Sequence, residues 1–215
     1  MTDPVAGKGR FITFEGGEGV GKSTQVRILF EKLMERGIDC LLTREPGGST
    51  GAEEVRELLV KGGTDKWHPM TEALLHNAAR AEHLESTVKP AIKDGTWVIS
   101  DRYADSTLAY QGYGQGVEVE TLLKLHAIST ADYWPDLTIV LDGNELHRAI
   151  EREEESFDKE DRYERMGEDF HERLQRSFVD IANKNPERCV LISANGTIDE
   201  VAARVWLAVQ DRLGL

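Results

Sequence analysis

Residues 16–23 of the chain read Gly16-Gly17-Glu18-Gly19-Val20-Gly21-Lys22-Ser23, which is a complete G-x-x-x-x-G-K-[ST] phosphate-binding loop. The glycines of such a loop let successive backbone N–H groups turn toward the phosphates of a nucleotide. Its lysine brings a positive charge to the β- and γ-phosphates, and its serine hydroxyl can ligate Mg²⁺. This P-loop, together with Thr24 directly after it, therefore predicts a site for a nucleoside triphosphate such as ATP, bound with Mg²⁺.

The sequence on either side of the P-loop supports this prediction. Residues 11–14 are a short run of β-forming residues. Residues 23–36 carry apolar side chains at helical spacing, namely Val26, Leu29, Phe30 and Leu33. A strand that leads through a loop into a helix points the positive end of the helix dipole at the bound phosphates.

The rest of the chain alternates short apolar runs with helical patterns. The expected strands lie at residues 11–15, 39–43, 97–100, 137–141 and 188–192. The expected helices lie at residues 22–36, 52–61, 70–94, 119–129, 145–154, 161–183 and 199–212. Such alternation, with continuously apolar strands, predicts a parallel sheet covered on both faces. We therefore expect an α/β fold of the P-loop NTPase type, with a five-stranded parallel sheet, helices on both faces and a small mobile lid.

Length, charge and cysteine content restrict the possible functions. A chain of 215 residues has the size of one domain, which we expect at residues 10–215 after a flexible arm at residues 1–9. The formal net charge of −13 argues against nucleic acid or an anionic membrane as the main partner. No apolar run reaches the ~18 residues of a membrane span. Cys40 and Cys189 lie in short apolar runs, so we expect reduced, buried thiols and a cytoplasmic setting.

Charged residues follow the second and third expected strands. In a parallel sheet, the side chains that act on a ligand gather beyond the carboxyl ends of the strands. Arg44 in the turn at residues 43–48, and Arg102 directly after the third strand, are placed to bind phosphate groups there. The neighbouring carboxylate of Asp101 suits a site for Mg²⁺ and phosphate.

Two further segments carry candidate binding residues. The helix expected at residues 70–94 places His76 and Arg80 one turn apart, where an aromatic ring and a guanidinium group could bind a base. Residues 151–165 contain eight acidic and four basic residues and interrupt the helical pattern after the fourth strand. A charged run is usually a solvated face, but this position predicts a lid at about residues 150–164 that closes over ATP. Its basic residues are Arg152, Lys159, Arg162 and Arg165.

Taken together, these motifs resemble those of the thymidylate kinase family, whose members convert dTMP to dTDP. The resemblance runs from about residue 10 to the end of the chain. Three segments carry it: residues 14–25 (FEGGEGVGKSTQ), 43–48 (TREPGG) and 101–112 (DRYADSTLAYQG). Adenylate and uridylate kinases share the first of these motifs but not the other two in this form.

The resemblance implies roles for the residues that bind dTMP. Glu18 would accept a hydrogen bond from the deoxyribose 3′-OH, and Arg44 and Arg102 would hold the phosphate. The peptide bond before Pro46 would be cis, and Tyr110 would crowd the 2′ position and disfavour ribonucleotides. The remaining substrate-binding residues would be His76 at the position that stacks on thymine, Arg80 as a hydrogen-bond donor to thymine, Ser106, Thr107 and Gln111.

The resemblance also implies the layout of the donor side. Arg148 would pack on adenine, and Asn195 would belong to the loop that holds adenine after the last strand. Ser23 and Asp101 would organise Mg²⁺. The family members are commonly homodimers packed through long helices, so a homodimer is expected here.

The catalytic arginine is expected in the lid. One branch of the family carries this residue in the P-loop and the other carries it in the lid, and the P-loop of this chain contains no arginine. Arg152 and Arg162 are the two candidates, and the sequence leaves the choice open. Phosphoryl transfer requires in-line positioning and neutralisation of charge rather than covalent participation of the protein. We therefore expect Lys22, Arg102 and one lid arginine to stabilise charge, with no dedicated general base.

Two other functions remain open from the residues alone. A switch GTPase needs an Asn-Lys-x-Asp sequence, and the nearest match, at residues 183–186, has Pro186 in place of the aspartate. A kinase for another monophosphate is the second alternative. Uracil differs from thymine by one methyl group, which a hydrophobic pocket distinguishes by roughly 1–3 kcal/mol. We therefore expect dUMP to be a poor but real substrate.

Overall fold

The structure is a computed structural model that describes residues 8–143, 162, 163 and 165–215. Arg148, Arg152 and Lys159 lie outside the described residues, as do the helix expected at residues 145–154 and most of the predicted lid. The same holds for most of the N-terminal arm.

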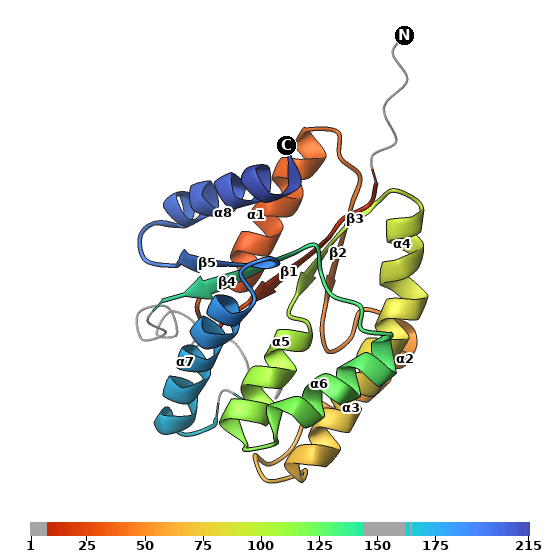
Figure 1. Cartoon of the computed structure of the whole chain (residues 1–215), viewed down its shortest axis with the longest axis vertical. Helices are drawn as coiled ribbons and strands as arrows, with labels where there is room; N and C mark the ends of the chain where they lie inside the picture. Colours follow the sequence, from red (N-terminus) through yellow and green to blue (C-terminus); the bar gives the residue numbers. More distant parts are fainter. Residues whose placement is uncertain (1–7, 144–161, 164) are drawn as a thin grey trace.

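The centre of the molecule is a five-stranded, fully parallel sheet, which confirms the predicted fold class (Figure 1). The order across the sheet is β2-β3-β1-β4-β5. The strands are β1 (Phe11–Glu15), β2 (Cys40–Arg44), β3 (Trp97–Asp101), β4 (Leu137–Asp142) and β5 (Cys189–Ser193). The last four end one residue later than predicted, because the polar residue at each strand end still pairs with a neighbouring strand, as Arg44 does with Asp101 and Asp142 with Ser193.

Most of the predicted helices are confirmed, with two corrections. The helical elements are α1 (Lys22–Glu35), α2 (Thr50–Val60), α3 (Pro69–His83), η1 (Leu84–Val88), α4 (Lys89–Lys93), α5 (Ala104–Thr107), η2 (Leu108–Gly114), α6 (Val119–Thr130), α7 (Glu168–Lys184) and α8 (Ile198–Leu213).

The first correction concerns the helix expected at residues 70–94. It is interrupted by the π-helical turn η1 just before Pro90, whose ring and missing N–H disfavour a regular α-helix. The second concerns the helix expected at residues 161–183, which begins only at Glu168, after the extended cap residue Gly167. Arg162 and Tyr163, which were expected in this helix, form a turn instead, and the side chain of Arg162 is fully buried.

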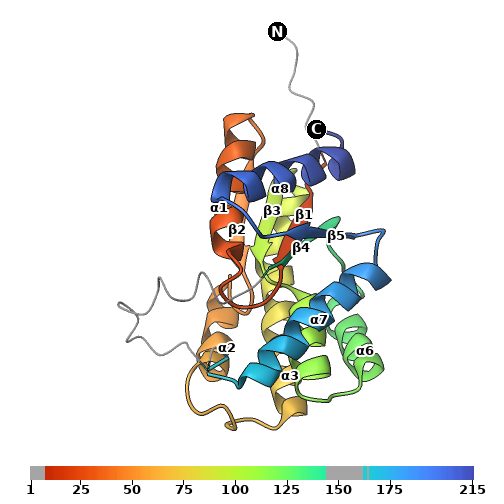
Figure 2. The same ribbon diagram turned by 90° about the vertical axis from the view of Figure 1, so that its left-hand side faces the viewer.

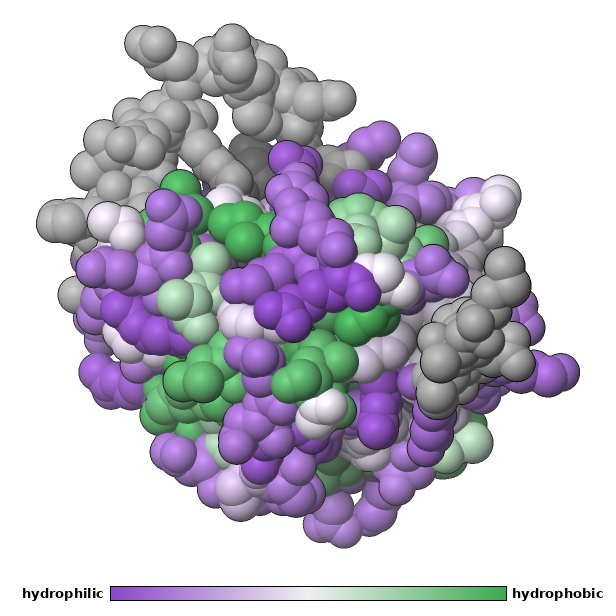
Figure 3. All heavy atoms as spheres, turned by 90° about the horizontal axis from the view of Figure 1, so that it is seen from above, coloured by the Kyte–Doolittle hydropathy of each residue, from purple (hydrophilic) through white to green (hydrophobic). Residues whose placement is uncertain are grey.

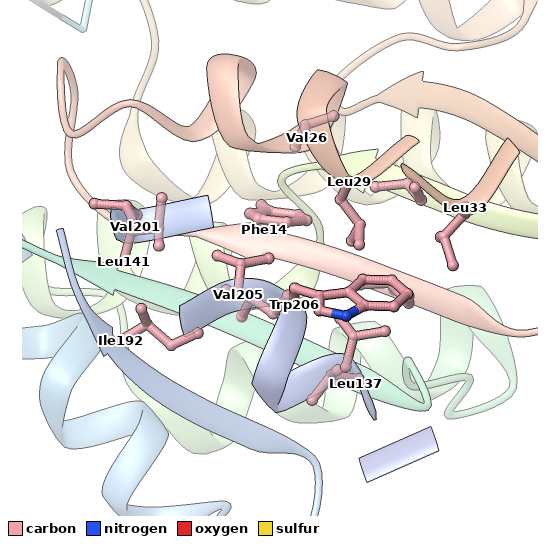
Figure 4. Close-up of a cluster of buried hydrophobic side chains, with 14 of the residues drawn as sticks. Phe14, Val26, Leu29, Leu33, Leu137, Leu141, Ile192, Val201, Val205 and Trp206 are labelled. Atoms are coloured by element: carbon pink, nitrogen blue, oxygen red, sulfur yellow. The ribbon is translucent and has the colours of Figure 1, made fainter. Parts of the chain in front are cut away.

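Helices cover both faces of the sheet because both faces are apolar. On one face, α1 and α8 lie next to each other (Figures 1 and 2). Their apolar side chains, including Leu29, Val205 and Trp206, enclose Phe14 and Leu137 of the sheet (Figure 4). On the other face, Val140 of β4 packs against η2, α6 and α7. Alternate strand residues thus serve opposite layers.

The outer surface of the α1–α8 layer is mixed in character. Viewed from the end of the molecule that carries these helices, hydrophobic side chains occur in small groups between hydrophilic ones (Figure 3). Among the described residues, no helix is both long and apolar enough to cross a membrane. Cys40 and Cys189, the first residues of β2 and β5, are free thiols, as predicted; Cys189 is buried and Cys40 is half-buried.

Candidate active site

The P-loop follows β1 and leads into α1, as the sequence predicts. Gly16 has a φ of 136°, and a Cβ atom there would lie 2.5 Å from the backbone oxygen of Leu141. Gly21 precedes α1 with a φ of 96°. Because L-residues with side chains rarely adopt such angles, glycine is required for the loop to turn within contact of β4. The turn leaves the amino end of α1 at the carboxyl edge of the sheet.

The side chain of Lys22 turns back over the P-loop. Its Nζ atom donates hydrogen bonds to the backbone oxygen of Gly16, at 3.0 Å, and to that of Gly17. Burial, and then the neighbouring charge of Arg102, lower the pKa of Lys22 to about 8. The ammonium group is therefore poorly solvated, and an anionic ligand in the loop would stabilise its charged form.

Ser23 and Asp101 meet at the edge of the P-loop. The Ser23 hydroxyl donates to Asp101 Oδ2 at 2.7 Å, and both residues line a groove of about 460 Å³ that also contains Arg44 and Arg27. Hydroxyl and carboxylate oxygens are ligands that suit Mg²⁺. Within the described part of the chain there is no cluster of three or more carboxylate, histidine or cysteine ligands. The Ser23 hydroxyl and the Asp101 carboxylate would suit Mg²⁺, which takes few protein ligands and completes its shell with water and phosphate oxygens.

Arg102 connects the P-loop to the segment that follows β3. Its guanidinium group donates to Glu18 Oε1 at 2.7 Å and to the Gly16 backbone oxygen and Ser106 Oγ, both at 3.1 Å. The Tyr110 hydroxyl donates to the same Glu18 oxygen at 2.7 Å, and the guanidinium group lies 5.1 Å from the centre of the Tyr110 ring. Burial alone would raise the pKa of Glu18, but the charges of Arg102 and Lys22 outweigh it and lower the pKa to about 2. Glu18, Arg102, Ser106 and Tyr110 therefore form one contiguous site.

Glu15 is a residue of this site that the sequence reasoning missed. It is fully buried at the end of β1 and accepts hydrogen bonds from the backbone N–H groups of Tyr103, at 2.7 Å, and Ser106, at 3.2 Å. The Ser106 hydroxyl donates to its second oxygen at 2.6 Å. Burial, and then the charge of Asp105, raise the pKa of Glu15 to about 7. Glu15 thus ties down the turn in which Arg102 has a φ of 71°. The sequence showed only an acidic residue at the end of a strand, and such a residue is ordinarily exposed.

Arg80 is held rigidly in a buried network. Its Nε atom donates to Glu45 Oε2 at 2.8 Å, and its Nη2 atom donates to Thr107 Oγ1 at 3.0 Å and to the Tyr103 backbone oxygen at 3.2 Å. With a longer bond from Nη1 to Asn77, four of its five N–H groups are bonded among the described residues. His83 lies between Glu45 Oε1 and the Thr43 hydroxyl, at 2.9 and 2.7 Å. This network is continuous with the Glu45–Pro46 peptide, which is cis as predicted.

Arg44 lies at the rim of the groove, where a phosphate group could reach it. Its side chain is 53% exposed and donates to Glu53 Oε2 at 3.2 Å. The other Glu53 oxygen accepts from the Gly48 N–H at 2.9 Å, and Arg56 donates to the Pro46 backbone oxygen at 2.8 Å. A surface pair of this kind contributes little to stability, so Arg44 can exchange Glu53 for a phosphate group at small cost.

His76 and Gln111 lie around the buried carboxylate of Glu72. The Tyr163 hydroxyl lies 2.9 Å from both His76 Nε2 and Glu72 Oε1, and Gln111 Nε2 donates to the same Glu72 oxygen at 2.7 Å. Burial, and then the charges of Arg80 and Arg162, lower the pKa of His76 to about 3. The imidazole is thus neutral at ordinary pH.

Arg162, one of the two candidates for the lid arginine, is held in a buried ion pair. Its guanidinium group is fully buried and pairs with Glu72 Oε2 at 2.5 Å. It also donates to the backbone oxygens of Leu59, Gly63 and Thr64 at 2.8–3.2 Å. These bonds anchor the chain that follows the predicted lid to the connection between α2 and α3. A charged run in the sequence could not reveal that one of its arginines has a buried carboxylate as partner.

The loop after β5 and the end of α7 are fixed by local bonds. Arg204 of α8 donates to the backbone oxygens of Ser193 and Asn195 at 2.6 and 2.7 Å, so Asn195 lies in a rigid turn. The Asn-Lys-Asn sequence considered for a GTPase lies at the carboxyl end of α7, where Asn185 Nδ2 donates to the Ile181 backbone oxygen at 2.8 Å. That role is an ordinary helix cap.

Comparisons with known proteins show which chains this one is similar to. A family model described as Thymidylate kinase matches residues 14–205. The chain is 48% identical over 205 residues to the thymidylate kinase of Rhizorhabdus wittichii. The match covers 95% of this chain and 99% of that protein. It is 45% identical over 211 residues to the thymidylate kinase of Caulobacter vibrioides, and the match covers 97% of this chain and 99% of that protein. The crystal structure of thymidylate kinase from Ehrlichia chaffeensis matches with a TM-score of 0.75 and 36% identity, covering 94% of this chain and 99% of that one.

Proposed function

The chain belongs to the thymidylate kinase family and phosphorylates dTMP in nucleotide biosynthesis, and from that premise we propose how its residues divide the work. ATP is the phosphoryl donor and is bound with Mg²⁺. The triphosphate lies in the P-loop, dTMP lies between Arg102 and Arg80, and the adenine of ATP lies near Asn195 and Arg148. The two free thiols support a reducing compartment, the cytoplasm, as the place of action.

The donor phosphates are held by the P-loop residues and by the amino end of α1. The backbone N–H groups of the loop bind phosphate oxygens, and Lys22 exchanges its two loop carbonyls for the phosphates. Ser23 and Asp101 hold Mg²⁺, directly or through water. The metal, when bound, neutralises charge on the triphosphate. All of these groups lie at the carboxyl edge of the sheet, which supports a shared role.

The acceptor is held at three points. Arg102 and Arg44 bind the phosphate of dTMP. Glu18 accepts from the 3′-OH with Tyr110 beside the sugar, and Ser106 and the loop at Pro46 keep these groups in position. At the base, His76 stacks on thymine, Arg80 donates to it through its remaining N–H, and Thr107 and Gln111 complete the pocket. The contact that carries this assignment is the ion pair of Glu18 with Arg102, because it joins the P-loop to the acceptor side in one site.

The transfer itself requires positioning and charge. The acceptor is already a phosphate oxyanion, so no residue has to remove a proton from it. Lys22 and Arg102 flank the path of the phosphoryl group and stabilise the charge that develops there. Arg152 is the remaining candidate for the lid arginine, since Arg162 has its guanidinium group committed to Glu72.

We expect a specific order of turnover when acceptors are compared. With ATP and Mg²⁺, dTMP gives strong ADP release, and dUMP gives kcat/KM lower by about 10- to 200-fold because a pocket distinguishes one methyl group by that factor. The ribose form of TMP, AMP, CMP and GMP give little. The measurement is a coupled ADP assay that includes a reaction without acceptor. Equal rates with all acceptors, or ADP release without one, would contradict the proposed pocket.

We also propose that the protein is a homodimer that associates through α2, α3 and α6. The helix α3 packs against both α2 and α6, and the three helices expose large apolar side chains. These include Leu58 at 45%, Leu74 at 50% and Ile128 at 83%. An apolar surface spread over neighbouring helices favours association with a second copy.

Replacing Leu74 and Ile128 together by lysine should convert the dimer into a monomer, because charges on this surface would have to be desolvated in the interface. Sedimentation equilibrium measures the mass. Leu207→Lys is the matched control, since Leu207 is 68% exposed on α8, away from these helices, and it should leave the dimer intact. A monomeric wild-type protein would refute the dimer, and a dimeric double variant would refute the surface.

A further inference from the structure

Glu72 is a fully buried carboxylate to which none of the binding roles above is assigned, yet it organises the residues around the base. Its Oε1 atom accepts hydrogen bonds from Gln111 at 2.7 Å, from Tyr163 at 2.9 Å and from Gln115 at 3.1 Å. Its Oε2 atom accepts from Arg162 at 2.5 Å. A carboxylate is an acceptor only and has no donor, so all four groups must turn an N–H or O–H toward Glu72.

This arrangement fixes the direction of the Gln111 amide. Because the carboxylate can only accept, Gln111 must turn its NH₂ group toward Glu72 and its carbonyl oxygen away. That oxygen, Gln111 Oε1, is buried and has no hydrogen-bond partner among the described residues, and the side chain is 1% exposed. A buried carbonyl without a partner is costly. It therefore indicates that a ligand supplies the missing donor.

Glu72 also sets the proton position on His76. Tyr163 donates its hydroxyl hydrogen to Glu72, so its oxygen accepts from His76 Nε2. The neutral imidazole thus carries its proton on Nε2. One carboxylate determines the hydrogen-bonding polarity of both residues next to the base.

We propose that Glu72 is a specificity-determining residue for the acceptor base, acting through the Gln111 amide. The inference rests on the proposed function, because it places the base of dTMP beside Gln111 and Arg80. Thymine and uracil carry an N3–H donor beside the O4 acceptor, whereas cytosine carries an N3 acceptor beside an amino donor. The carbonyl of Gln111 accepts from the N3–H group, and the remaining N–H of Arg80 donates to O4. With cytosine, the Gln111 carbonyl would face the N3 acceptor and the Arg80 N–H would face the amino donor, so neither hydrogen bond could form.

The contacts around Gln111 support its place at the base. Thr107, one turn earlier in the same helical segment, binds Arg80, and the neighbouring Tyr110 binds Glu18 of the P-loop. The segment therefore runs from the phosphate end of the acceptor site to Arg80. A site built to hydrogen-bond a substrate group can reject an analogue that lacks the group by about 10⁴-fold, far more than the methyl group of thymine provides.

The test compares kcat/KM for dTMP, dUMP and dCMP in the wild type and in Glu72→Gln. A glutamine at position 72 can donate to Gln111 Oε1, which allows the Gln111 amide to reverse and present NH₂ to the base. We expect the dTMP:dCMP ratio to fall by at least about tenfold. The dTMP:dUMP ratio should stay within twofold, because both bases carry N3–H. Glu82→Gln is the matched control: Glu82 is exposed on the same helix, and the change removes the same charge.

Gln111→Leu and the double variant Glu72→Gln/Gln111→Leu complete a double-mutant cycle. If Glu72 acts through the amide, Gln111→Leu lowers the dTMP:dCMP ratio, and adding Glu72→Gln lowers it no further. A ratio that stays within twofold of wild type in Glu72→Gln would overturn the proposal and leave Glu72 with a structural role only, as would independent, multiplying losses in the double variant.

A second variant separates the effect of Glu72 on base specificity from its effect on folding. Glu72→Gln leaves Arg162 buried without its carboxylate, which can prevent folding. Glu72→Gln/Arg162→Met removes both charges, and it is expected to show the same fall in the dTMP:dCMP ratio; an unchanged ratio overturns the proposal. Melting temperatures confirm that each variant is folded in the assay. A wild type that does not phosphorylate dTMP would contradict the function itself, whereas an unchanged ratio in a folded variant contradicts only the role of Glu72.

Discussion

Replacing Lys22 by alanine is expected to lower kcat by about 10³-fold and to leave the fold intact. Lys22 carries the positive charge closest to the proposed path of the transferred phosphoryl group, and charge stabilisation is the main contribution that a protein makes to this reaction. The loss therefore falls mostly on kcat rather than on KM for dTMP.

The folded state should tolerate this change well. In the structure, Lys22 is buried, its hydrogen bonds go to loop carbonyls, and its pKa is lowered to about 8 by burial and by Arg102. Removing this ammonium group relieves its burial cost and its repulsion from Arg102, which offsets the lost bonds to the loop carbonyls and the lost attraction to Glu18, so we expect the melting temperature to change little. A coupled ADP assay and thermal melts by circular dichroism measure the two quantities.

Lys93→Ala is the matched control for this experiment. Lys93 lies in the last turn of α4 with its side chain exposed, so the same substitution there should preserve both kcat and the melting temperature. A folded Lys22→Ala protein that retains more than a tenth of the wild-type kcat would show that Lys22 does not act on the transferred group.

Replacing Arg102 by lysine is expected to raise KM for dTMP by about 100-fold and to lower kcat as well. The guanidinium group holds Glu18, the Gly16 carbonyl and Ser106 at the same time and lies over the Tyr110 ring. An ammonium group is a point charge without this planar fork, so it cannot keep these contacts and also bind a phosphate bidentately. Steady-state kinetics with dTMP varied at saturating ATP measure the effect.

The same substitution should also destabilise the protein, because it weakens the ion pair of the half-buried Glu18 carboxylate. The pKa of Glu18 is lowered to about 2 largely by Arg102, so the stabilisation is present at neutral pH and is lost only as the pH falls toward 2. At pH 7 the melting temperature of Arg102→Lys should therefore lie below that of the wild type. Arg176→Lys, on an exposed arginine of α7 that pairs with Glu172, should change neither KM nor the melting temperature. Unaltered KM in Arg102→Lys would exclude Arg102 as a phosphate ligand.

The limits of prediction from sequence are clearest in the helices. The pattern of apolar residues located α1, α2, α6 and α8 to within two residues, since burial of one face leaves a period that can be read directly. It failed at Pro90, where one residue alters the backbone without disturbing the period, and before Glu168, where Arg162 lies buried in a turn and not in a helix.

The candidate site divides in the same way. The P-loop, Arg44, Asp101 and Arg102 could be predicted because they lie within short motifs at strand ends, where a parallel sheet gathers its ligand-binding groups. Glu15 and Glu72 could not, because an acidic residue in a strand or helix is ordinarily exposed. Tyr103, a partner of Glu15, lies 88 positions away in the sequence, and Arg162, a partner of Glu72, lies 90 positions away.

The sequence by itself determined the order of strands and helices, the triphosphate site and the family, because each depends on residues that are neighbours in the chain. The tertiary structure alone decided which charged groups became buried partners. It paired Arg162 with Glu72, and it oriented the Gln111 amide through a separate hydrogen bond to the same carboxylate. The reason is physical: a buried carboxylate must collect its donors from whatever elements pack around it, and that packing joins segments whose separation in the sequence carries no periodic or local signal.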